Sequence, residues 1–396
     1  MNQPRQGLSL SCQNESKEFF LKAWPTLGIL IVQTLLCLAH WFLYCTWIDF
    51  WFPMSPHALG HFRIMVIVLS ASFIVAALLG FRFTNFVVAF IYQLASVWLG
   101  ILNYLFFGAC LAWLLDLTLR VAFPGQEHLL ARPYIAAAFV VLAVATSVYG
   151  IVNARIIRIR RVSVALPNLP AAWSNRVAMV FSDIHLGNIN GLRFARRIAN
   201  LAQHLQPDII FIPGDLFDGT RADPSIIAAP FFSMRPSLGT FFVAGNHEEF
   251  GGSTHYTAAL RHGGFNVLED AQVNIDGLKI IGTSYSASSH PMRHRHFLMG
   301  LHLSPEEPSI LLQHVPHRLP VVEQAGVSLM LSGHTHSGQI LPFSWITRRA
   351  FGKFTYGLQS FGTLQVYTSS GAGTWGPPMR VGTSPEVVLV SFRSAS

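Results

Sequence analysis

The sequence predicts a chain of two unlike parts: a group of transmembrane helices, followed by an α/β domain built on two β-sheets. Hydrophobic residues make up 51% of the 396 residues and charged residues only 12%, whereas about a quarter of a soluble domain is usually charged. Long apolar runs fill residues 23–153, and from residue 177 onward short apolar runs alternate with longer mixed segments. Five of the short runs are followed closely by His, Asp or Asn, which indicates a site at strand ends.

Four apolar runs in the first part are long enough to cross a membrane. A spanning helix needs about 20 apolar residues, and we predict four of them in residues 23–153, after an N-terminal tail at residues 1–22. Trp41, Trp47 and Trp51 at the end of the first run are typical of an aromatic belt at the membrane surface. The predicted helices are residues 23–50, 64–81, 86–115 and 134–153.

The number of spans decides on which side of the membrane the α/β domain lies. The third run is long enough to form two short segments instead of one helix, which would reverse that side. Cationic residues favour the cytoplasmic side; Arg5, Lys17 and Lys22 precede the first helix and four arginines follow the fourth. Both ends on one side require an even number of spans. We therefore predict a multi-pass protein of the inner or plasma membrane whose α/β domain is cytoplasmic.

A basic juxtamembrane linker is expected at residues 154–170. Four arginines and no acidic residue lie between Ala154 and Arg161, and Pro167 and Pro170 follow. Half of the net charge of +8 comes from this segment, so the charge balance does not indicate a nucleic-acid partner. The arginines instead mark the cytoplasmic side and favour contact with anionic membrane lipids.

Residues 171–396 are predicted to form the α/β domain. Residues 192–205 and 256–262 have helical spacing, and the short apolar runs have the length of buried strands. Strands with few helices after residue 265 favour a sandwich of two sheets. The predicted strands are residues 177–181, 209–213, 240–244, 279–281, 309–312, 328–331, 365–368 and 387–391.

Cysteine chemistry is excluded from this domain. Cys12, Cys37, Cys45 and Cys110 are the four cysteines of the chain, and none follows residue 110. The domain therefore has no disulfide framework, no thiolate nucleophile and no cysteine-ligated zinc.

Side chains that bind divalent cations follow five of the predicted strands. A single histidine is usually a structural residue, but core packing does not explain the same pattern after five strands. Carboxylate, amide oxygen and imidazole suit Mn²⁺, Fe or Zn²⁺. The donors exceed the need of one ion, and two ions about 3.5–4 Å apart activate a hydroxide and polarise both oxygens of a phosphoryl displacement. The seven donors are Asp183, His185, Asp215, Asn246, His314, His334 and His336.

Three of these residues carry particular weight. His334 and His336 stand one residue apart in Gly333-His334-Thr335-His336. Residues i and i+2 of an extended chain point to the same side, so both imidazoles are expected to face one pocket. Asp215 follows a central strand and is the expected bridge between the two ions.

These motifs resemble those of the calcineurin-like metallophosphoesterase superfamily. The resemblance covers residues 162–396 and implies a four-layer αββα sandwich with a two-metal centre. It rests on Asp183-x-His185, Gly214-Asp215, Gly245-Asn246-His247-Glu248, His314 and Gly333-His334-Thr335-His336, in that order.

The resemblance also implies roles for these residues. His247 resembles the general acid or transition-state stabiliser of the family, and imidazole suits the protonation of a leaving alkoxide. Together with Asp215 it is expected to be catalytic. The resemblance assigns Asp183, His185 and His336 to the first ion, Asn246, His314 and His334 to the second, and Asp215 to both.

A closer resemblance is to the membrane-anchored branch of this family, which places several spans before the phosphoesterase domain. Residues 371–380 and Pro385-Glu386-Val387 look like the tail of that branch. Leu216-Phe217-Asp218-Gly219 lacks the arginine found there in protein phosphatases, which argues against a phosphoprotein substrate.

Three arginines are candidates for binding substrate. Arg380 lies in a Gly/Pro-rich loop, and Arg293 and Arg295 lie in a basic segment expected to be a loop between strands. The alternatives are a structural salt bridge for Arg380 and a solvated turn for the other two.

Three functions remain open. The first is hydrolysis of a phosphodiester or pyrophosphate; the anchor and the arginines favour a lipid-linked or membrane-surface ester, with a soluble phosphodiester or phosphomonoester as the alternative. The second is a membrane transporter or sensor with a regulatory metal-binding domain, but the predicted spans hold few polar residues and no charged pair, so transport is poorly supported. The third is an inactive metal-binding scaffold, which the complete donor set disfavours. Fold alone does not give the substrate.

Overall fold

The computed structural model describes residues 8–51, 53–123, 125 and 127–394. Its internal contacts divide the chain into two units. The helical unit comprises Met1–Leu78 and Ile101–Val144, and the site unit comprises Leu79–Gly100 and Ala145–Ser396. The site unit therefore contains not only the α/β domain but also short parts of three of the long apolar helices.

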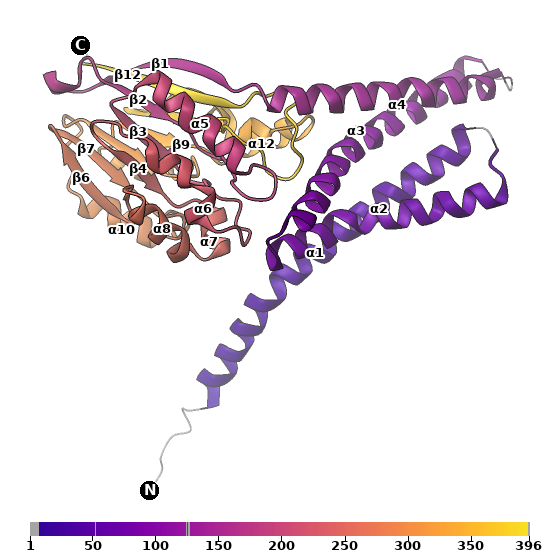
Figure 1. The fold of residues 1–396 in the computed structure, drawn as a ribbon, viewed down its shortest axis with the longest axis horizontal. Coiled ribbons are helices and arrows are strands. Elements are labelled where there is room, and N and C mark those ends of the chain that lie inside the picture. The colour runs from indigo at the N-terminus through magenta and orange to yellow at the C-terminus, as the bar shows by residue number, and fades with distance from the viewer. Residues whose placement is uncertain (1–7, 52, 124, 126, 395–396) are drawn as a thin grey trace, which may run out of the picture. The chain divides into compact units, whose positions relative to one another are not determined.

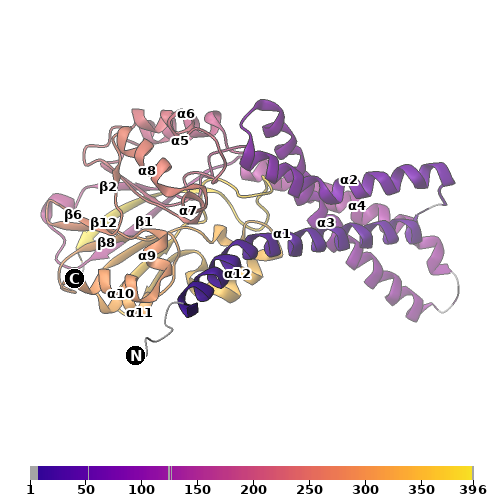
Figure 2. The same cartoon turned by 90° about the horizontal axis from the view of Figure 1, so that it is seen from below.

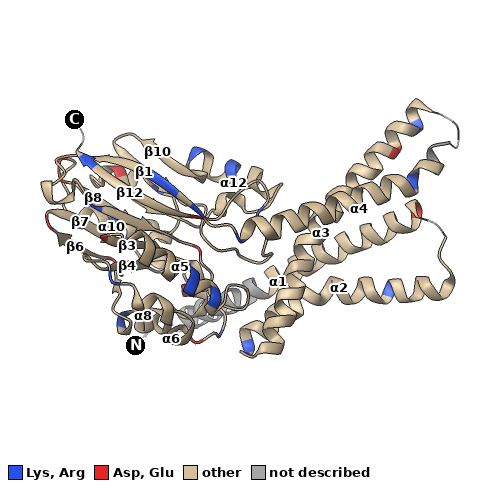
Figure 3. Ribbon diagram, turned by 45° about the horizontal axis from the view of Figure 1, so that its top comes forward, with Lys and Arg blue, Asp and Glu red and all other residues tan. Residues whose placement is uncertain are grey.

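Four helices have the length and composition needed to cross a membrane. Charged residues are sparse along them, as the colouring in Figure 3 shows, and the third is one continuous helix rather than two segments. They are α1 (Leu8–Phe50), α2 (Pro56–Arg82), α3 (Phe86–Ala122) and α4 (Glu127–Ala154).

The helices are longer than the apolar runs that predict them. Helix α1 begins within the predicted tail, of which residues 1–7 lie outside the described part of the chain. Helix α3 continues seven residues beyond the predicted end at Leu115. Helix α4 begins before Pro133, where the sequence places a loop, because membrane helices tolerate a proline whose neighbours satisfy the freed backbone groups.

The extended helices bring a buried ion pair into the helical unit. Arg132 places Nε 2.9 Å from Asp116 Oδ1 and a terminal nitrogen 3.0 Å from Oδ2, and Arg120 lies 2.8 Å from the same carboxylate. The side chain of Asp116 is only 1% exposed. The expectation of no charged pair in the spans was thus wrong, because the predicted spans ended just short of Asp116 and Arg132.

The site unit is built on two six-stranded sheets. The first has the order β1-β12-β2-β3-β4-β5 and the second the order β10-β11-β9-β8-β7-β6. Strands β2, β3 and β4 run parallel, as do β7, β8 and β9. The central strands are β2 (Val177–Val180), β3 (Ile209–Pro213), β4 (Thr240–Val243), β7 (Leu278–Gly282), β8 (Ser309–Leu312) and β9 (Leu329–Ser332). The outer strands are β1 (Arg158–Leu166), β5 (Asn266–Val267), β6 (Ala271–Ile275), β10 (Gly357–Phe361), β11 (Leu364–Thr368) and β12 (Glu386–Ser394).

Three apolar cores stack these elements into four layers. One core lies between the sheets, one between the first sheet and α5 and α8, and one between the second sheet and α10 and α11. Figures 1 and 2 show helices on the outer face of each sheet. The predicted αββα sandwich preceded by four apolar helices is confirmed. The helices are α5 (Leu192–Leu205), α6 (Pro224–Ile227), α7 (Asn246–Gly251), α8 (Ser253–His262), α9 (Tyr285–Ser289), α10 (Pro291–Gly300), α11 (Leu319–Gln324) and α12 (Phe343–Phe351).

Strand β1 occupies much of the segment predicted to be a linker. It pairs in parallel with β12 along its full length, from Arg158 opposite Glu386 to Leu166 opposite Ser394. Val164 and Leu166 are fully buried. The alternation of apolar and polar residues that predicts a strand is present here, but the arginines conceal it.

Candidate functional site

The seven predicted donors lie just beyond the C-terminal ends of the central parallel strands. Such strands bring their carboxyl ends to one edge, where the following loops meet. Asp183 and His185 follow β2, Asp215 follows β3, Asn246 begins α7 after β4, His314 follows β8, and His334 and His336 follow β9.

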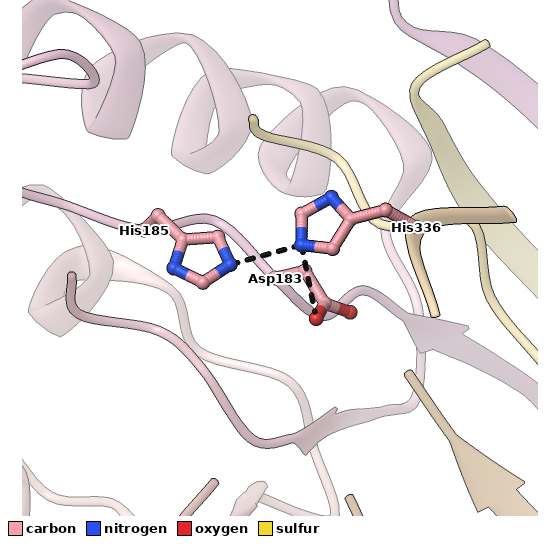
Figure 4. A group of neighbouring side chains, drawn as sticks. All are labelled: Asp183, His185 and His336. Atoms are coloured by element: carbon pink, nitrogen blue, oxygen red, sulfur yellow. Dashed lines mark hydrogen bonds and ion pairs between the residues drawn. The ribbon is translucent and has the colours of Figure 1, made fainter. Parts of the chain in front are cut away.

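One group of donors consists of Asp183, His185 and His336. Nε2 of His185 lies 3.0 Å from Nε2 of His336, which in turn lies 3.5 Å from Asp183 Oδ1 (Figure 4). All three residues are buried. Two ligands each about 2.0–2.2 Å from one ion lie about 3–3.5 Å from each other, so these spacings suit a shared cation.

A second group surrounds the side-chain amide of Asn246. Oδ1 of Asn246 lies 3.1 Å from His314 Nε2 and 3.0 Å from His334 Nδ1. Asp215 belongs to this group as well, with Oδ2 3.1 Å from His314 Nε2. The same oxygen is 3.8 Å from His185 Nε2. Asp215 is thus the residue within reach of both groups.

The contacts around His314 require a positive charge that a neutral imidazole does not supply. Nδ1 of His314 lies 2.8 Å from the carbonyl oxygen of Pro213, so it must carry the ring proton of a neutral imidazole. The lone pair of Nε2 then points at two oxygens that have no proton to offer, Asp215 Oδ2 and Asn246 Oδ1. Either an additional proton or a metal ion must lie between these three atoms.

Charge and burial set the protonation of the donors. Burial lowers the pKa of His185 and of His336 well below the ordinary value and lowers that of His334 to about 3. Burial opposes charge on His314, but the neighbouring Asp215 carboxylate outweighs it and raises the pKa of His314 to about 10. The imidazoles of His185, His334 and His336 are therefore neutral at pH 7, as metal binding requires. At His314 a metal cation would have to compete with a proton.

The charge on His314 also shifts the pKa values of the Asp215 and Asp183 carboxyl groups. Burial alone would raise the pKa of Asp215, but the positive charge on His314 lowers it far below its ordinary value. Burial raises the pKa of Asp183 to about 6, against the opposing charge of His314. Asp215 therefore stays ionised over the whole physiological pH range.

The backbone of the site is held in an uncommon conformation. Left-handed backbone at a residue other than glycine costs on the order of 1–3 kcal/mol and clusters at functional sites. Two glycines permit close approach, because a Cβ at Gly245 would overlap Asp215 and one at Gly333 would overlap Asp183. Five donors have positive φ: Asp183 (53°), His185 (50°), Asp215 (52°), His334 (69°) and His336 (46°).

His247 stands beside the donors with one nitrogen committed. Its Nδ1 lies 2.9 Å from the carbonyl oxygen of Asp218, so Nδ1 donates and Nε2 is left to exchange a proton. Its backbone N–H donates to Asp215 Oδ1 at 3.0 Å. The ring lies 4.6 Å from that of His185 and 5.7 Å from that of Trp375, centroid to centroid. His247 thus stands where an acid could reach a substrate held by the donors.

Glu248 is a positioning residue in the first turn of α7. Its buried carboxylate accepts hydrogen bonds from the backbone N–H groups of Gly245 (2.7 Å), Asp215 (3.0 Å) and Phe217 (2.9 Å). Burial and the Asp215 carboxylate raise the pKa of Glu248 to about 8, against these donors. Glu248 thereby ties the loop that carries Asp215 to the start of α7.

The structure corrects the expectation that Arg380 contacts substrate. Its side chain is 0% exposed and donates to the carbonyl oxygens of His336 (2.8 Å), Gly371 (3.3 Å) and Gly373 (2.7 Å). A terminal nitrogen of its guanidinium also lies 3.2 Å from Nδ1 of His336. Arg380 therefore braces His336 from behind, because the Gly-rich loop folds over it instead of opening to solvent.

Arg293 and Arg295 are also placed differently from the prediction. Both lie on helix α10 rather than in a loop, because the segment that follows Pro291 forms a continuous helix. Arg293 pairs with Asp270 at 2.7 Å and Arg295 donates to Gln324 at 2.8 Å. Their partners are not metal donors, so the structure gives them no part in the site.

The apolar helices contact the loop that carries Arg380 within the site unit. The carbonyl oxygen of Gly150 in α4 accepts from the N–H of Arg380 at 2.9 Å. Nδ2 of Asn153 donates to the carbonyl oxygens of Arg380 (2.9 Å) and Thr383 (2.8 Å). Helix α4 is thus connected to the metal donor His336 through Arg380.

A four-layer αββα sandwich with His and Asp donors gathered at its strand ends is an architecture of metal-dependent phosphoric ester hydrolases. Comparison with known families agrees: residues 177–338 match the family described as calcineurin-like phosphoesterase. Residues 177–338 therefore form a calcineurin-like metallophosphoesterase domain, and in the described part of the chain four apolar helices long enough to cross a membrane precede it.

Three relatives illustrate the match. An uncharacterized metallophosphoesterase of Campylobacter jejuni is 29% identical over 76% of this chain and 83% of the relative. A transmembrane protein with metallophosphoesterase domain is 31% identical in Bos taurus, over 68% of this chain and 64% of the relative. Its namesake in Danio rerio is 30% identical, over 64% of this chain and 62% of the relative. The match therefore spans less than two thirds of the length of the two vertebrate relatives.

Proposed function

We propose that this protein is a membrane-anchored hydrolase of a phosphodiester or pyrophosphate, and that a lipid-linked or membrane-surface ester is its substrate. It would act with two divalent cations, drawn from Mn²⁺, Fe and Zn²⁺. The observation that carries the proposal is the position of Asp215, which lies 3.1 Å from His314 in one donor group and 3.8 Å from His185 in the other.

Each donor has a stated part in this proposal. Two bound cations supply Lewis acidity at the phosphoryl oxygens and lower the pKa of a water. Asp215 is ionised, its backbone N–H donates to Glu248, and its carboxylate accepts from the backbone N–H of His247, so it is held in a position from which it could bridge two ions. Asp183, His185 and His336 would hold one ion, and Asn246, His314 and His334 the other.

His247 would supply the proton for the leaving oxygen. Because Nδ1 donates to the Asp218 carbonyl, Nε2 is the atom that holds and releases the catalytic proton. A positioned imidazole contributes about 10²–10⁴-fold in rate. The role applies most strongly to esters whose leaving alkoxide is basic.

Exposed apolar side chains around the site support an amphipathic substrate. Phe250 is 72% and Trp375 58% exposed, and both rings lie within 6 Å of that of His247. Helix α12 exposes Trp345 (70%) and Ile346 (64%) and carries two arginines in its last turn. Apolar and basic residues on one short helix are typical of contact with a membrane surface.

The four apolar helices would span the membrane, with the α/β domain in the cytoplasm. Arg5, Lys17 and Lys22, which precede the apolar span Thr26–Phe50 of α1, and the four arginines that follow α4 support this orientation. A reporter that is active only in the periplasm and that became active when fused after residue 165 would contradict it.

The test is Mn²⁺-dependent hydrolysis by the full chain of bis-p-nitrophenyl phosphate, p-nitrophenyl phosphate and lipid pyrophosphates. We expect turnover of a diester or pyrophosphate that Asp215→Asn abolishes while folding is retained. No turnover by the folded, metal-loaded chain would indicate an inactive scaffold, and equal turnover by Asp215→Asn would contradict the role of Asp215. Hydrolysis of soluble esters alone would remove the lipid part of the proposal.

A further inference from the structure

A cavity of about 550 Å³ lies in the site unit between the apolar helices and the start of α5. Val97 of α3 and Ile151 and Ala154 of α4 form one wall, and Leu192 and Phe194 of α5 belong to another. None of the seven metal donors lines it. The cavity is therefore separate from the candidate metal site.

The apolar wall of the cavity continues into exposed apolar surface. On α3, Phe90 is 50% and Leu94 55% exposed; on α4, Val148 is 55% and Val152 52% exposed. These residues are within two turns of the lining residues of the same helices. In a membrane protein such a surface faces acyl chains, so the cavity opens along a path that a lipid tail can follow.

The lining of the cavity is also strongly cationic. Arg155, Arg193 and Arg197 all line it, and the lining includes no Asp or Glu. Within the described residues no ion pair involves these three arginines; Arg197 donates only to the carbonyl oxygen of Arg155. Helix α5 begins here at Gly191 without a side-chain cap or an acidic residue in its first turn, which adds the positive end of its dipole. Figure 3 shows the arginines of α5 in blue.

We propose that this cavity binds an anionic glycerophospholipid of the surrounding membrane, as a resident ligand and not as the substrate. The phosphate lies among the three arginines and the start of α5, and an acyl chain lies along α3 and α4. Charge complementarity selects the anionic headgroup, and the exposed apolar surface selects a lipid over a free phosphate.

Asn190 connects this cavity to the donor loop. It lines the cavity, and its Nδ2 donates to the carbonyl oxygens of Ile184 (2.8 Å) and Thr374 (3.2 Å). Ile184 stands between Asp183 and His185. A lipid that orders Asn190 therefore also orders the segment that carries two metal donors.

The test uses native mass spectrometry of the full chain in detergent, with added phosphatidylglycerol or phosphatidylcholine. We expect phosphatidylglycerol to bind at least tenfold more tightly. Each arginine near a lipid phosphate contributes about fivefold in affinity, so Arg193→Gln with Arg197→Gln weakens phosphatidylglycerol binding about 25-fold. Arg196→Gln is the matched control, because Arg196 is exposed on the same helix but does not line this cavity.

A cavity-filling variant keeps the inference falsifiable if the arginine variants fold poorly. Val97→Trp is expected to weaken binding of both lipids. Equal binding of the two lipids by the unmodified chain, or unchanged binding in the arginine and Val97 variants, would overturn the proposal. Hydrolysis of the bound phosphatidylglycerol in metal-loaded protein would overturn its resident role.

The lipid measurement is separable from the proposed function. Binding is read with the metals chelated, so a failure of the hydrolysis assays leaves it unaffected. Conversely, a chain that hydrolyses its substrate but binds no phosphatidylglycerol would refute only the lipid site.

Discussion

Replacement of Arg380 by methionine tests whether this buried residue braces a metal donor or contacts substrate. The guanidinium donates to the carbonyl oxygens of His336, Gly371 and Gly373. Two of these carbonyls keep another donor in the variant: Gln339 N–H for His336 and Glu386 N–H for Gly371. Among the described residues, no other donor to the Gly373 oxygen is present, so this carbonyl is left without a hydrogen bond in the variant.

The expected losses of stability and of metal affinity follow from the hydrogen bonds that Arg380→Met removes. One buried carbonyl left unsatisfied costs about 1–3 kcal/mol, and methionine recovers part of the apolar packing, so we expect the free energy of unfolding to fall by about 2–3 kcal/mol. His336 keeps its side chain but loses the group that fixes its strained backbone. Loss of such a partner typically weakens metal binding about 10–100-fold.

The assay is a Mn²⁺ titration of diester hydrolysis by the full chain. We expect Arg380→Met to raise the Mn²⁺ concentration at half-maximal activity, with KM for substrate at saturating Mn²⁺ nearly unchanged. The Mn²⁺ concentration at half-maximal activity of Arg380→Lys should lie between those of the unmodified protein and Arg380→Met. The control variant Arg295→Met, on the surface of α10, should have the same value as the unmodified protein. A raised KM with unchanged Mn²⁺ dependence would refute the bracing role and restore the substrate contact.

Three further outcomes are expected. His247→Gln should lower kcat about 10²–10⁴-fold without loss of bound metal. The loss of kcat should be larger for alkyl esters than for p-nitrophenyl esters, because the p-nitrophenolate leaving group needs no proton. Equal losses of kcat for the two kinds of ester would count against the acid role. Asp116→Ala should lower the free energy of unfolding in detergent by about 3–5 kcal/mol, because Arg132 is left as an unpaired buried charge; an unchanged melting temperature would show that the pair contributes nothing. Burial lowers the pKa of His294 to about 4, so as pH falls from about 6.5 to 4 the unfolded chain binds a proton at this histidine before the folded chain does. The free energy of unfolding should therefore drop by up to about 3 kcal/mol over that pH range. His294→Leu should remove this contribution, and an equally steep loss of stability with falling pH in the variant would refute it.

The sequence predicted the fold and the gathering of the candidate donors because both depend on local patterns. Short apolar runs define the central strands, and the residue types that follow them, such as Asp183 and His185, are those that bind cations. Parallel strands then bring distant loops together. The resemblance to a known family narrowed the architecture to four layers.

The missed features depend on contacts between distant segments. Arg380 lies in a loop whose composition resembles an open turn, and only the tertiary structure shows that it is buried behind His336. Strand β1 carries arginines that hide its alternation, and its partner β12 lies more than 200 residues away. The role of Glu248 requires the loop after β3 to return to the start of α7, which no local pattern reveals.

The central claim is that Asp215 is shared by two cation-binding groups. The most direct measurement is the number of Mn²⁺ ions per chain, by elemental mass spectrometry of the loaded full chain and of Asp215→Asn. We predict two ions in the unmodified protein and fewer than two in the variant, with turnover lost in parallel. One ion or none in the unmodified protein, or two ions in the variant, would contradict a shared carboxylate.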